Sequence, residues 1–105
     1  MSTSVSIAIP TKNAGPAFAA TLAAIRAQEH PVLEIVIADS GSTDDTVAIA
    51  SVAGARVIAI PPEAFGHGRT RNVLVDACRG ELVALLVQDA VPADARWLTH
   101  LVEAL

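Results

Sequence analysis

Short aliphatic runs alternate with segments of helical spacing along the whole length of the chain. The runs predict strands at 5–9, 35–38, 56–60 and 82–87, because they are rich in valine, isoleucine and leucine and are followed by turn-forming residues. Apolar residues three and four positions apart predict helices over 16–30, 43–53 and 70–78, and a last helix after Asp94. Strands joined by helices of this length form right-handed crossovers, so we expect an α/β domain with a mostly parallel sheet.

The first proline limits the length of the first strand. Pro10 follows this strand directly and lacks an N–H group, so we expect the strand to stop before it.

All 105 residues fit a single domain, 1–105. Four strands leave one sheet edge open, and no terminating glycine follows the last helix. We therefore expect a truncated domain that could self-associate through its open edge.

Composition excludes several classes of partner. The net charge is −4 and aromatic residues make up 3% of the chain, so it offers neither a basic stripe for nucleic-acid phosphates nor stacking platforms for bases. The longest apolar run, 82–87, is far too short to span a bilayer. The single cysteine, Cys78, cannot form an internal disulfide, which is typical of a reducing compartment. We expect a cytoplasmic protein without a membrane span, with peripheral attachment to the inner face of the membrane left open.

Ligands of such sheets bind beyond the carboxyl ends of the strands, so the informative loops begin at Pro10, Asp39, Pro61 and Gln88. The first loop holds one glycine, Gly15, where a dinucleotide-binding loop has three. The glycine-rich loop of nucleoside triphosphatases is absent as well. The third strand ends at a proline rather than at the acid of a phosphoreceiver domain. These patterns argue against all three classes.

Two aspartates stand at strand ends, and each admits two interpretations. Asp39 could accept hydrogen bonds from a base or a ribose, or it could shape the turn over 39–42. Asp89 could hold Mg²⁺ or Mn²⁺ together with substrate phosphates, or it could turn the chain before Pro92. Spacing alone leaves both choices open.

The segment 66–72 combines two glycines with Arg69 and Arg71 at the start of a predicted helix. Glycine lets the backbone approach a ligand, a helix N-terminus attracts phosphate, and arginine binds a diphosphate through charge-assisted bonds. The segment therefore fits a diphosphate site, and a solvated surface loop is the competing interpretation.

Taken together, these loops resemble the family 2 glycosyltransferases, which have the GT-A fold. The resemblance is carried by four motifs in order along nearly the whole chain: Ile9-Pro10-Thr11-Lys12-Asn13, Asp39-Ser40-Gly41-Ser42-Thr43-Asp44, His67-Gly68-Arg69-Thr70-Arg71-Asn72, and Gln88-Asp89-Ala90 with Pro92. Each motif is weak alone, and the combination is specific. The stretch from Phe65 to Asn72 is most similar to the rhamnosyltransferase-type members. The resemblance implies a GT-A or Rossmann-like sheet and a role in polysaccharide biosynthesis.

The resemblance also implies a role for each matching position. Asp39 would bond the base, and Arg71 and Asn72 would lie near the diphosphate and the sugar. The full set of expected nucleotide-sugar-binding residues is Pro10, Thr11, Asn13, Asp39, Ser42, Arg71 and Asn72.

The metal site departs from the family's pattern. Asp89 would match the last acid of the family's DxD motif, which ligates Mg²⁺ or Mn²⁺. Val87 and Gln88 replace the first two positions, so only one carboxylate remains. We expect weak metal binding in the absence of a donor diphosphate, with metal independence left open.

The resemblance predicts a donor domain that binds a UDP- or dTDP-sugar for inverting transfer to an acceptor hydroxyl. The half that would bind a glycan or lipid-linked acceptor, and the general base, are expected beyond Leu105. One alternative is a non-catalytic nucleotide-binding or interaction module of the same fold. Another is a nucleotidylyltransferase, which would need a first loop rich in glycine and in basic residues, where this chain offers only Lys12.

Overall fold

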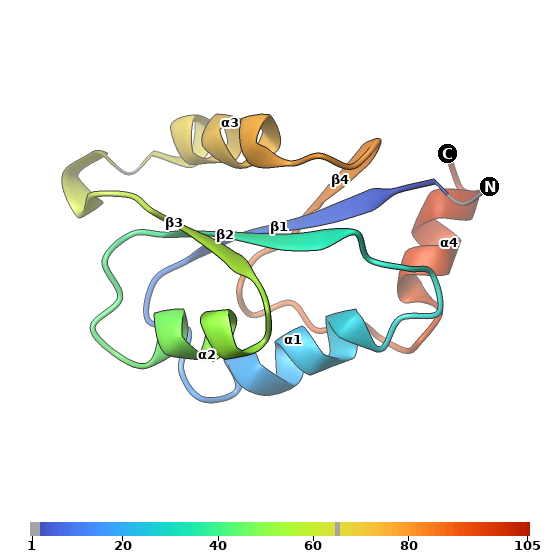
Figure 1. The fold of residues 1–105 in the computed structure, drawn as a ribbon, viewed down its shortest axis with the longest axis horizontal. Helices are drawn as coiled ribbons and strands as arrows, with labels where there is room; N and C mark the ends of the chain where they lie inside the picture. The colour runs from blue at the N-terminus through green and yellow to red at the C-terminus, as the bar shows by residue number, and fades with distance from the viewer. Residues whose placement is uncertain (1–2, 65) are drawn as a thin grey trace.

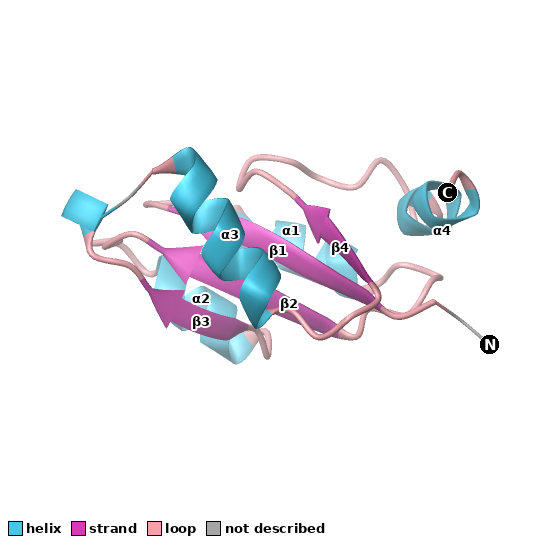
Figure 2. Ribbon diagram, turned by 90° about the horizontal axis from the view of Figure 1, so that it is seen from above, coloured by secondary structure: helices cyan, strands magenta, loops and turns pink. Residues whose placement is uncertain are grey.

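The computed structural model describes residues 3–64 and 66–105, which form one four-stranded sheet with helices on both faces (Figure 1). In chain order the elements are β1 (Val5–Thr11), α1 (Phe18–Arg26), β2 (Glu34–Asp39), α2 (Thr46–Val52), β3 (Arg56–Ala59), the 3-10 helix η1 (Pro62–Ala64), α3 (His67–Ala77), β4 (Leu82–Leu85) and α4 (Trp97–Glu103). The strand order is β3-β2-β1-β4 and every neighbouring pair is parallel (Figure 2). The predicted α/β architecture is therefore confirmed.

The two central strands bury side chains on both faces of the sheet. Successive residues of a strand point to opposite faces, so an aliphatic run supplies two layers of core at once. One layer packs against α1, α2 and α4, and the other packs against α3 (Figure 1). The strand residues of the first layer are Val5, Ile7, Ile9, Ile35 and Ile37, and those of the second are Ala8, Val36 and Ala38.

The expectation that Pro10 ends the first strand is wrong. β1 continues to Thr11, and Pro10 is paired with Ala38 of β2. The carbonyl of Thr11 accepts a hydrogen bond from the β2 side, whereas that of Ala8 accepts one from Leu86 on the β4 side. The N–H and C=O groups of successive residues point to opposite sides of a strand, so position 10 faces β4, as Ala8 does. The pairing of β1 with β4 ends at Ala8 and Leu85, before this point. A central strand tolerates this proline because its pairing with β2 is unaffected and β4 pairs with β1 only as far as Ala8.

The same geometry explains why β4 ends at Leu85, two residues earlier than expected. The next ladder bond from β1 would need an N–H at Pro10. At the other boundaries, α1 begins at Phe18 after a turn in which the Phe18 N–H donates to Gly15. α3 begins at His67, three residues before the expected start. In the described part of the chain, no helix is long and apolar enough to cross a membrane.

Candidate functional site

The carboxyl ends of β1 and β2 bring most of the predicted ligand-binding residues together. Thr11 and Asp39 are partners at the last position of the parallel ladder. Asn13 and Ser42 follow in the adjoining loops, and hydrogen bonds join all four residues into one network. Pro10 precedes Thr11 in β1. Five of the seven residues predicted to bind the nucleotide sugar thus share one edge of the sheet.

The Asp39 carboxylate organises the loop that follows β2. One oxygen accepts hydrogen bonds from the hydroxyls of Thr11, at 2.8 Å, and Ser42, at 2.5 Å. The other accepts from the backbone N–H groups of Gly41, at 3.2 Å, and Ser42, at 2.9 Å. Burial would raise the pKa of Asp39, but these hydrogen bonds outweigh it and hold the pKa below its ordinary value. The turn-shaping interpretation of Asp39 is therefore realised in the structure.

Asn13 locks the loop after β1 onto the loop after β2. Its backbone has a positive φ of 49°, a conformation that asparagine tolerates better than most residues. Its N–H donates to the Ser42 hydroxyl at 2.8 Å, and its side-chain oxygen accepts from the Thr43 N–H at 2.8 Å. Two more hydrogen bonds join the same two loops, from the Ala14 N–H to the Thr46 hydroxyl and from the Gly15 N–H to the Asp44 carboxylate. We call this set of bonds between the loops after β1 and β2 the seam.

The seam also depends on Asp44 and Gly41. The Asp44 carboxylate accepts hydrogen bonds from the hydroxyl and the N–H of Thr46, the first residue of α2, and from the N–H of Gly15, and these bonds lower the pKa of Asp44. Gly41 has a φ of +88°, and a Cβ there would lie 2.9 Å from the ring of Pro62. Both the backbone and the space at this position therefore require glycine.

Gln88 ties the segment after β4 to the same edge. Its side-chain oxygen accepts from the Lys12 N–H at 2.8 Å, and its side-chain nitrogen donates to the Lys12 carbonyl at 3.1 Å. The amide thus pairs with the backbone as a neighbouring strand would. The Lys12 ammonium group in turn donates to the Ser40 carbonyl at 3.0 Å. Three loops are joined in this way, and nothing in the sequence pattern indicated the Lys12–Gln88 pair.

Asp89, the predicted metal ligand, is exposed in a turn closed by a hydrogen bond from the Ala90 N–H to the Val87 carbonyl. Among residues 3–64 and 66–105, no group of three or more His, Cys, Asp or Glu side chains could hold a metal ion. A single carboxylate suits Mg²⁺ or Mn²⁺ only when phosphate oxygens supply further ligands. The donor set of the protein therefore fits a metal that arrives with a diphosphate and does not fit a permanent site.

The start of α3 carries the remaining predicted residues. Arg71 and Asn72 are both exposed there. Arg71 lines a pocket of about 180 Å³ together with Pro10, with Leu85 at the end of β4 and with the two residues that follow it, so α3 and the carboxyl end of β1 meet at this point. Phe65, the first residue of the rhamnosyltransferase-like stretch, lies outside the described residues.

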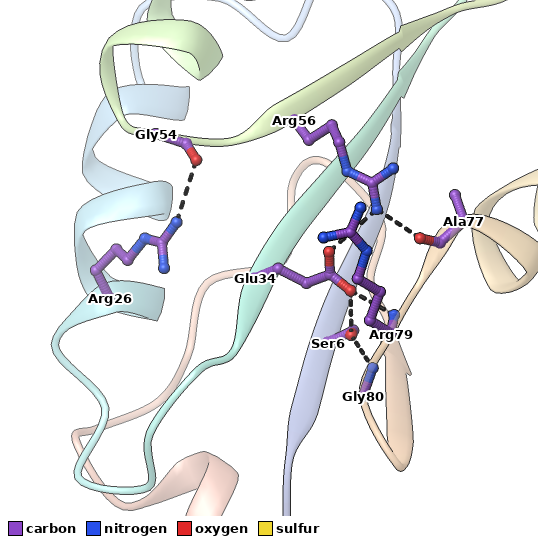
Figure 3. Close-up of polar contacts among 8 residues, drawn as sticks. All are labelled: Ser6, Arg26, Glu34, Gly54, Arg56, Ala77, Arg79 and Gly80. Carbon is purple, nitrogen blue, oxygen red and sulfur yellow. Dashed lines mark hydrogen bonds and ion pairs between the residues drawn. The ribbon is translucent and has the colours of Figure 1, made fainter.

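A polar cluster at the amino ends of the strands fixes the far end of α3 (Figure 3). Glu34 accepts hydrogen bonds from the Ser6 hydroxyl at 2.7 Å, from the Arg56 guanidinium at 3.1 Å and from the Arg79 N–H. Arg56 also donates to the carbonyl of Ala77, the last residue of α3. Burial would raise the pKa of Glu34, but the bonds from Arg79, Ser6 and Arg56 lower it. The cluster anchors α3 against the sheet at the end opposite the ligand loops.

Comparison with known proteins agrees with this geometry. The family model described as Glycosyl transferase family 2 matches residues 6–105. The chain is similar to the O-antigen chain rhamnosyltransferase WbaN of Salmonella anatum, at 40% identity over 90 residues that cover 84% of this chain and 29% of WbaN. It is also similar to the O-antigen chain rhamnosyltransferase RfbN of Salmonella typhimurium, at 35% identity over 100 residues that cover 93% of this chain and 32% of RfbN.

A solved structure supports the same assignment. Glucosyl-3-phosphoglycerate synthase from Mycobacterium tuberculosis, in complex with Mn²⁺, UDP and glucosyl-3-phosphoglycerate, has a TM-score of 0.77 and 25% identity over 96% of this chain and 39% of that chain. The present chain spans about a third of the length of the curated relatives that it matches. The family model covers nearly the whole chain, and the fold and the order of the motifs agree with it. The chain belongs to glycosyl transferase family 2.

Proposed function

We propose that the carboxyl edge of the sheet binds a nucleoside-diphosphate sugar, UDP- or dTDP-linked, as the donor side of an inverting glycosyltransferase. The observation that carries the proposal is the joining of three loops at this edge. Bonds through Asn13, Ser42 and Gln88 fix the loops before any ligand arrives. A preformed site avoids the entropic cost of ordering loops during binding.

The nucleoside would lie against the loops after β1 and β2, lined by Pro10, Thr11, Asn13, Asp39 and Ser42. Asp39 is 5% exposed, and each of its oxygens already accepts two hydrogen bonds. A direct bond to the base would therefore have to replace one of these donors. We assign Asp39 a positioning role, because its carboxylate holds the loop after β2 in the shape that binds the nucleoside. Where the base replaces one of the present donors, Asp39 would also accept a hydrogen bond from the base.

The diphosphate would lie near α3. Arg71 is exposed at the pocket, and in the described part of the chain it forms no ion pair. A guanidinium can bind phosphate oxygens through two parallel bonds and can stabilise the charge that develops as the diphosphate leaves. Asn72 would offer an amide beside it. Asp89 would hold Mg²⁺ or Mn²⁺, and that ion would supply further charge neutralisation on the phosphates when bound.

The sugar would be a 6-deoxyhexose such as rhamnose. This part of the proposal is supported by WbaN and RfbN, both O-antigen chain rhamnosyltransferases. The acceptor would be a glycan or lipid-linked hydroxyl, deprotonated by a base that is not among the residues described above. The reaction would take place in the cytoplasm, on substrates destined for a surface polysaccharide.

Calorimetry on the 105-residue chain tests the proposal, with UDP, dTDP and the uncharged nucleosides uridine and thymidine as ligands. Arg71→Ala should weaken binding of the diphosphates by about tenfold and leave the nucleosides unaffected, since one charge-assisted pair is lost. Arg79→Ala removes the same charge from an exposed position at the opposite end of the strands and serves as the control. Mn²⁺ should strengthen diphosphate binding, and Asp89→Ala should remove that increment. A folded chain that binds neither diphosphate would overturn the proposal.

A further inference from the structure

A groove runs between α1 and α2, which lie side by side on the face of the sheet opposite α3 (Figures 1 and 2). Both helices connect parallel strands, so both run from the carboxyl edge of the sheet to its amino edge. The groove has a volume of about 560 Å³. It is therefore a long, shallow surface that follows the two helices from one edge of the sheet to the other.

The walls of the groove are apolar although they face solvent. Ala19 and Ala23 of α1 line one side and Ala48 of α2 lines the other, and all three are exposed. Val52 projects beside them and is 90% exposed, the highest value among the large apolar side chains of the described residues. Apolar surface of this kind is typical of contacts between proteins, and small side chains let a second helix approach closely.

Two opposite charges stand at the two ends of the groove. Asp45 precedes α2 at the carboxyl edge, and Arg26 ends α1 at the amino edge. Seven residues of helix, or about 10 Å, separate the ends. Within the described residues neither side chain forms an ion pair. Arg26 only donates to the Gly54 carbonyl at 3.4 Å (Figure 3), and Asp45 makes no side-chain capping bond.

A second copy of the same chain matches both features of the groove. A two-fold axis through its middle exchanges the two ends, so Arg26 of each copy meets Asp45 of the other. Val52 of each copy then lies against Ala19 and Ala48 of the other copy, since these residues stand toward the Asp45 end. Packing in which the helices of the two copies run parallel would place like charges together. The charges therefore select the antiparallel arrangement.

We propose that the groove between α1 and α2 is the interface of a two-fold homodimer, held by apolar contact through Val52 and by two Arg26–Asp45 pairs. The interface lies away from the loops assigned to the nucleotide and does not depend on the proposed function. α1 has nine residues and α2 has seven, so the area covered is smaller than the roughly 800 Å² per partner of a stable complex. The dimer should therefore be weak, with a Kd on the order of 100 µM, and the chain should be monomeric at a few micromolar.

Sedimentation equilibrium up to a chain concentration of about 1 mM tests the proposal. Every chain carries Leu85→Lys, so that the open β4 edge does not contribute to association. Asp45→Arg makes both ends of the groove positive, and Arg26→Asp makes both ends negative. Asp76→Arg is the matched control, because Asp76 is an exposed aspartate of α3 on the opposite face of the sheet.

Each single charge reversal should weaken dimerisation by about tenfold or more, because symmetry repeats the change and two attractions become two repulsions. An equimolar mixture of Asp45→Arg and Arg26→Asp should form a mixed dimer with about the affinity of the parent chain, since opposite charges meet again at both ends. The double variant should dimerise like the parent for the same reason. Asp76→Arg should leave the affinity unchanged.

The mixture also controls for folding, because two damaged chains would not recover an interface on mixing. A parent chain that stays monomeric at 1 mM overturns the proposal and leaves the groove to a different partner. Dimerisation that survives both single reversals, or that is not recovered in the mixture and the double variant, contradicts the Arg26–Asp45 pairing. Loss of the dimer in Asp76→Arg would place the interface elsewhere. The proposed donor site stands or falls separately, because it is tested by nucleotide binding.

Discussion

Asp39→Asn should destabilise the chain in a way that depends on pH, because the charge of Asp39 holds the loop after β2. The carboxylate accepts four hydrogen bonds, two from hydroxyls and two from backbone N–H groups. Asparagine has nearly the same shape but offers one acceptor oxygen in place of two. Its oxygen can keep the N–H groups of Gly41 and Ser42. Its amino group then faces the hydroxyls of Thr11 and Ser42, which can no longer donate to residue 39.

The cost follows from the two bonds that are lost. A hydrogen bond to a charged group contributes about 1.5–3 kcal/mol, and both hydroxyls can recover part of that by accepting from the new amino group. We expect a loss of about 2–4 kcal/mol in the free energy of unfolding at pH 7. That is a large share of the roughly 5–15 kcal/mol that stabilises a typical domain.

The sign of the pH dependence follows from the depressed pKa. Hydrogen bonds place the pKa of Asp39 in the folded chain below that of the unfolded chain, which is about 3.9. The stabilisation by its carboxylate is therefore fully present above the unfolded value and is lost as the pH falls through the folded value. Asparagine does not titrate. The difference in unfolding free energy between wild type and Asp39→Asn should be constant near neutral pH and should shrink below a pH of about 4.

Urea unfolding at pH 7, 5, 4 and 3 measures this difference, with Trp97 as the reporter, since it is the chain's one tryptophan and packs against the core. The other depressed carboxyls, Glu34 and Asp44, titrate in both proteins and cancel in the difference. Asp45→Asn is the control, because Asp45 is exposed and makes no side-chain capping bond. A difference of the same size at pH 3 and pH 7 would contradict the reasoning.

Three further predictions concern other parts of the molecule. Gly80→Ala should lower the free energy of unfolding by about 1–3 kcal/mol, because its Cβ would lie 2.7 Å from the Ser6 nitrogen. Gly68→Ala is the control in the same urea assay and should not destabilise the chain, because no atom lies within 4 Å of its Cβ. Gln88→Ala should weaken nucleotide binding several-fold in calorimetry while hardly changing the unfolding temperature, because it releases one loop of the site and leaves the core intact. Unchanged nucleotide affinity, or a clear fall in the unfolding temperature, would refute this. The exposed β4 edge should make the chain self-associate at high concentration, and Leu85→Lys, a charge at a residue that is 42% exposed, should abolish association through this edge in sedimentation velocity.

The sequence predicted the elements well because their signals are local. Each strand is an aliphatic run with its own turn residues, and the order of strands and helices restricts the topology to parallel crossovers. Pro10 was mistaken for a strand end because its effect depends on which neighbour its nitrogen faces. That direction depends on which strands lie on either side of β1, and the local sequence does not contain this information.

The site could be predicted only in part for the same reason. Asp39 and Asn13 stand at strand ends, where loop position alone indicates a function. The pairing of Gln88 with Lys12 joins residues 76 positions apart, and that of Glu34 with Arg79 joins residues 45 positions apart. Such contacts follow from the assembled sheet and leave no periodic signal.

Binding of a nucleoside diphosphate at the carboxyl edge of the sheet can be tested by titrating the ¹⁵N-labelled chain with dTDP or UDP and following the amide chemical shifts. We predict shifts in three segments, 11–15, 39–43 and 70–72, and at Gln88, with none at the cluster around Glu34, Arg56 and Gly80. Shifts centred on that cluster, or no shifts at millimolar nucleotide in a folded sample, would contradict it.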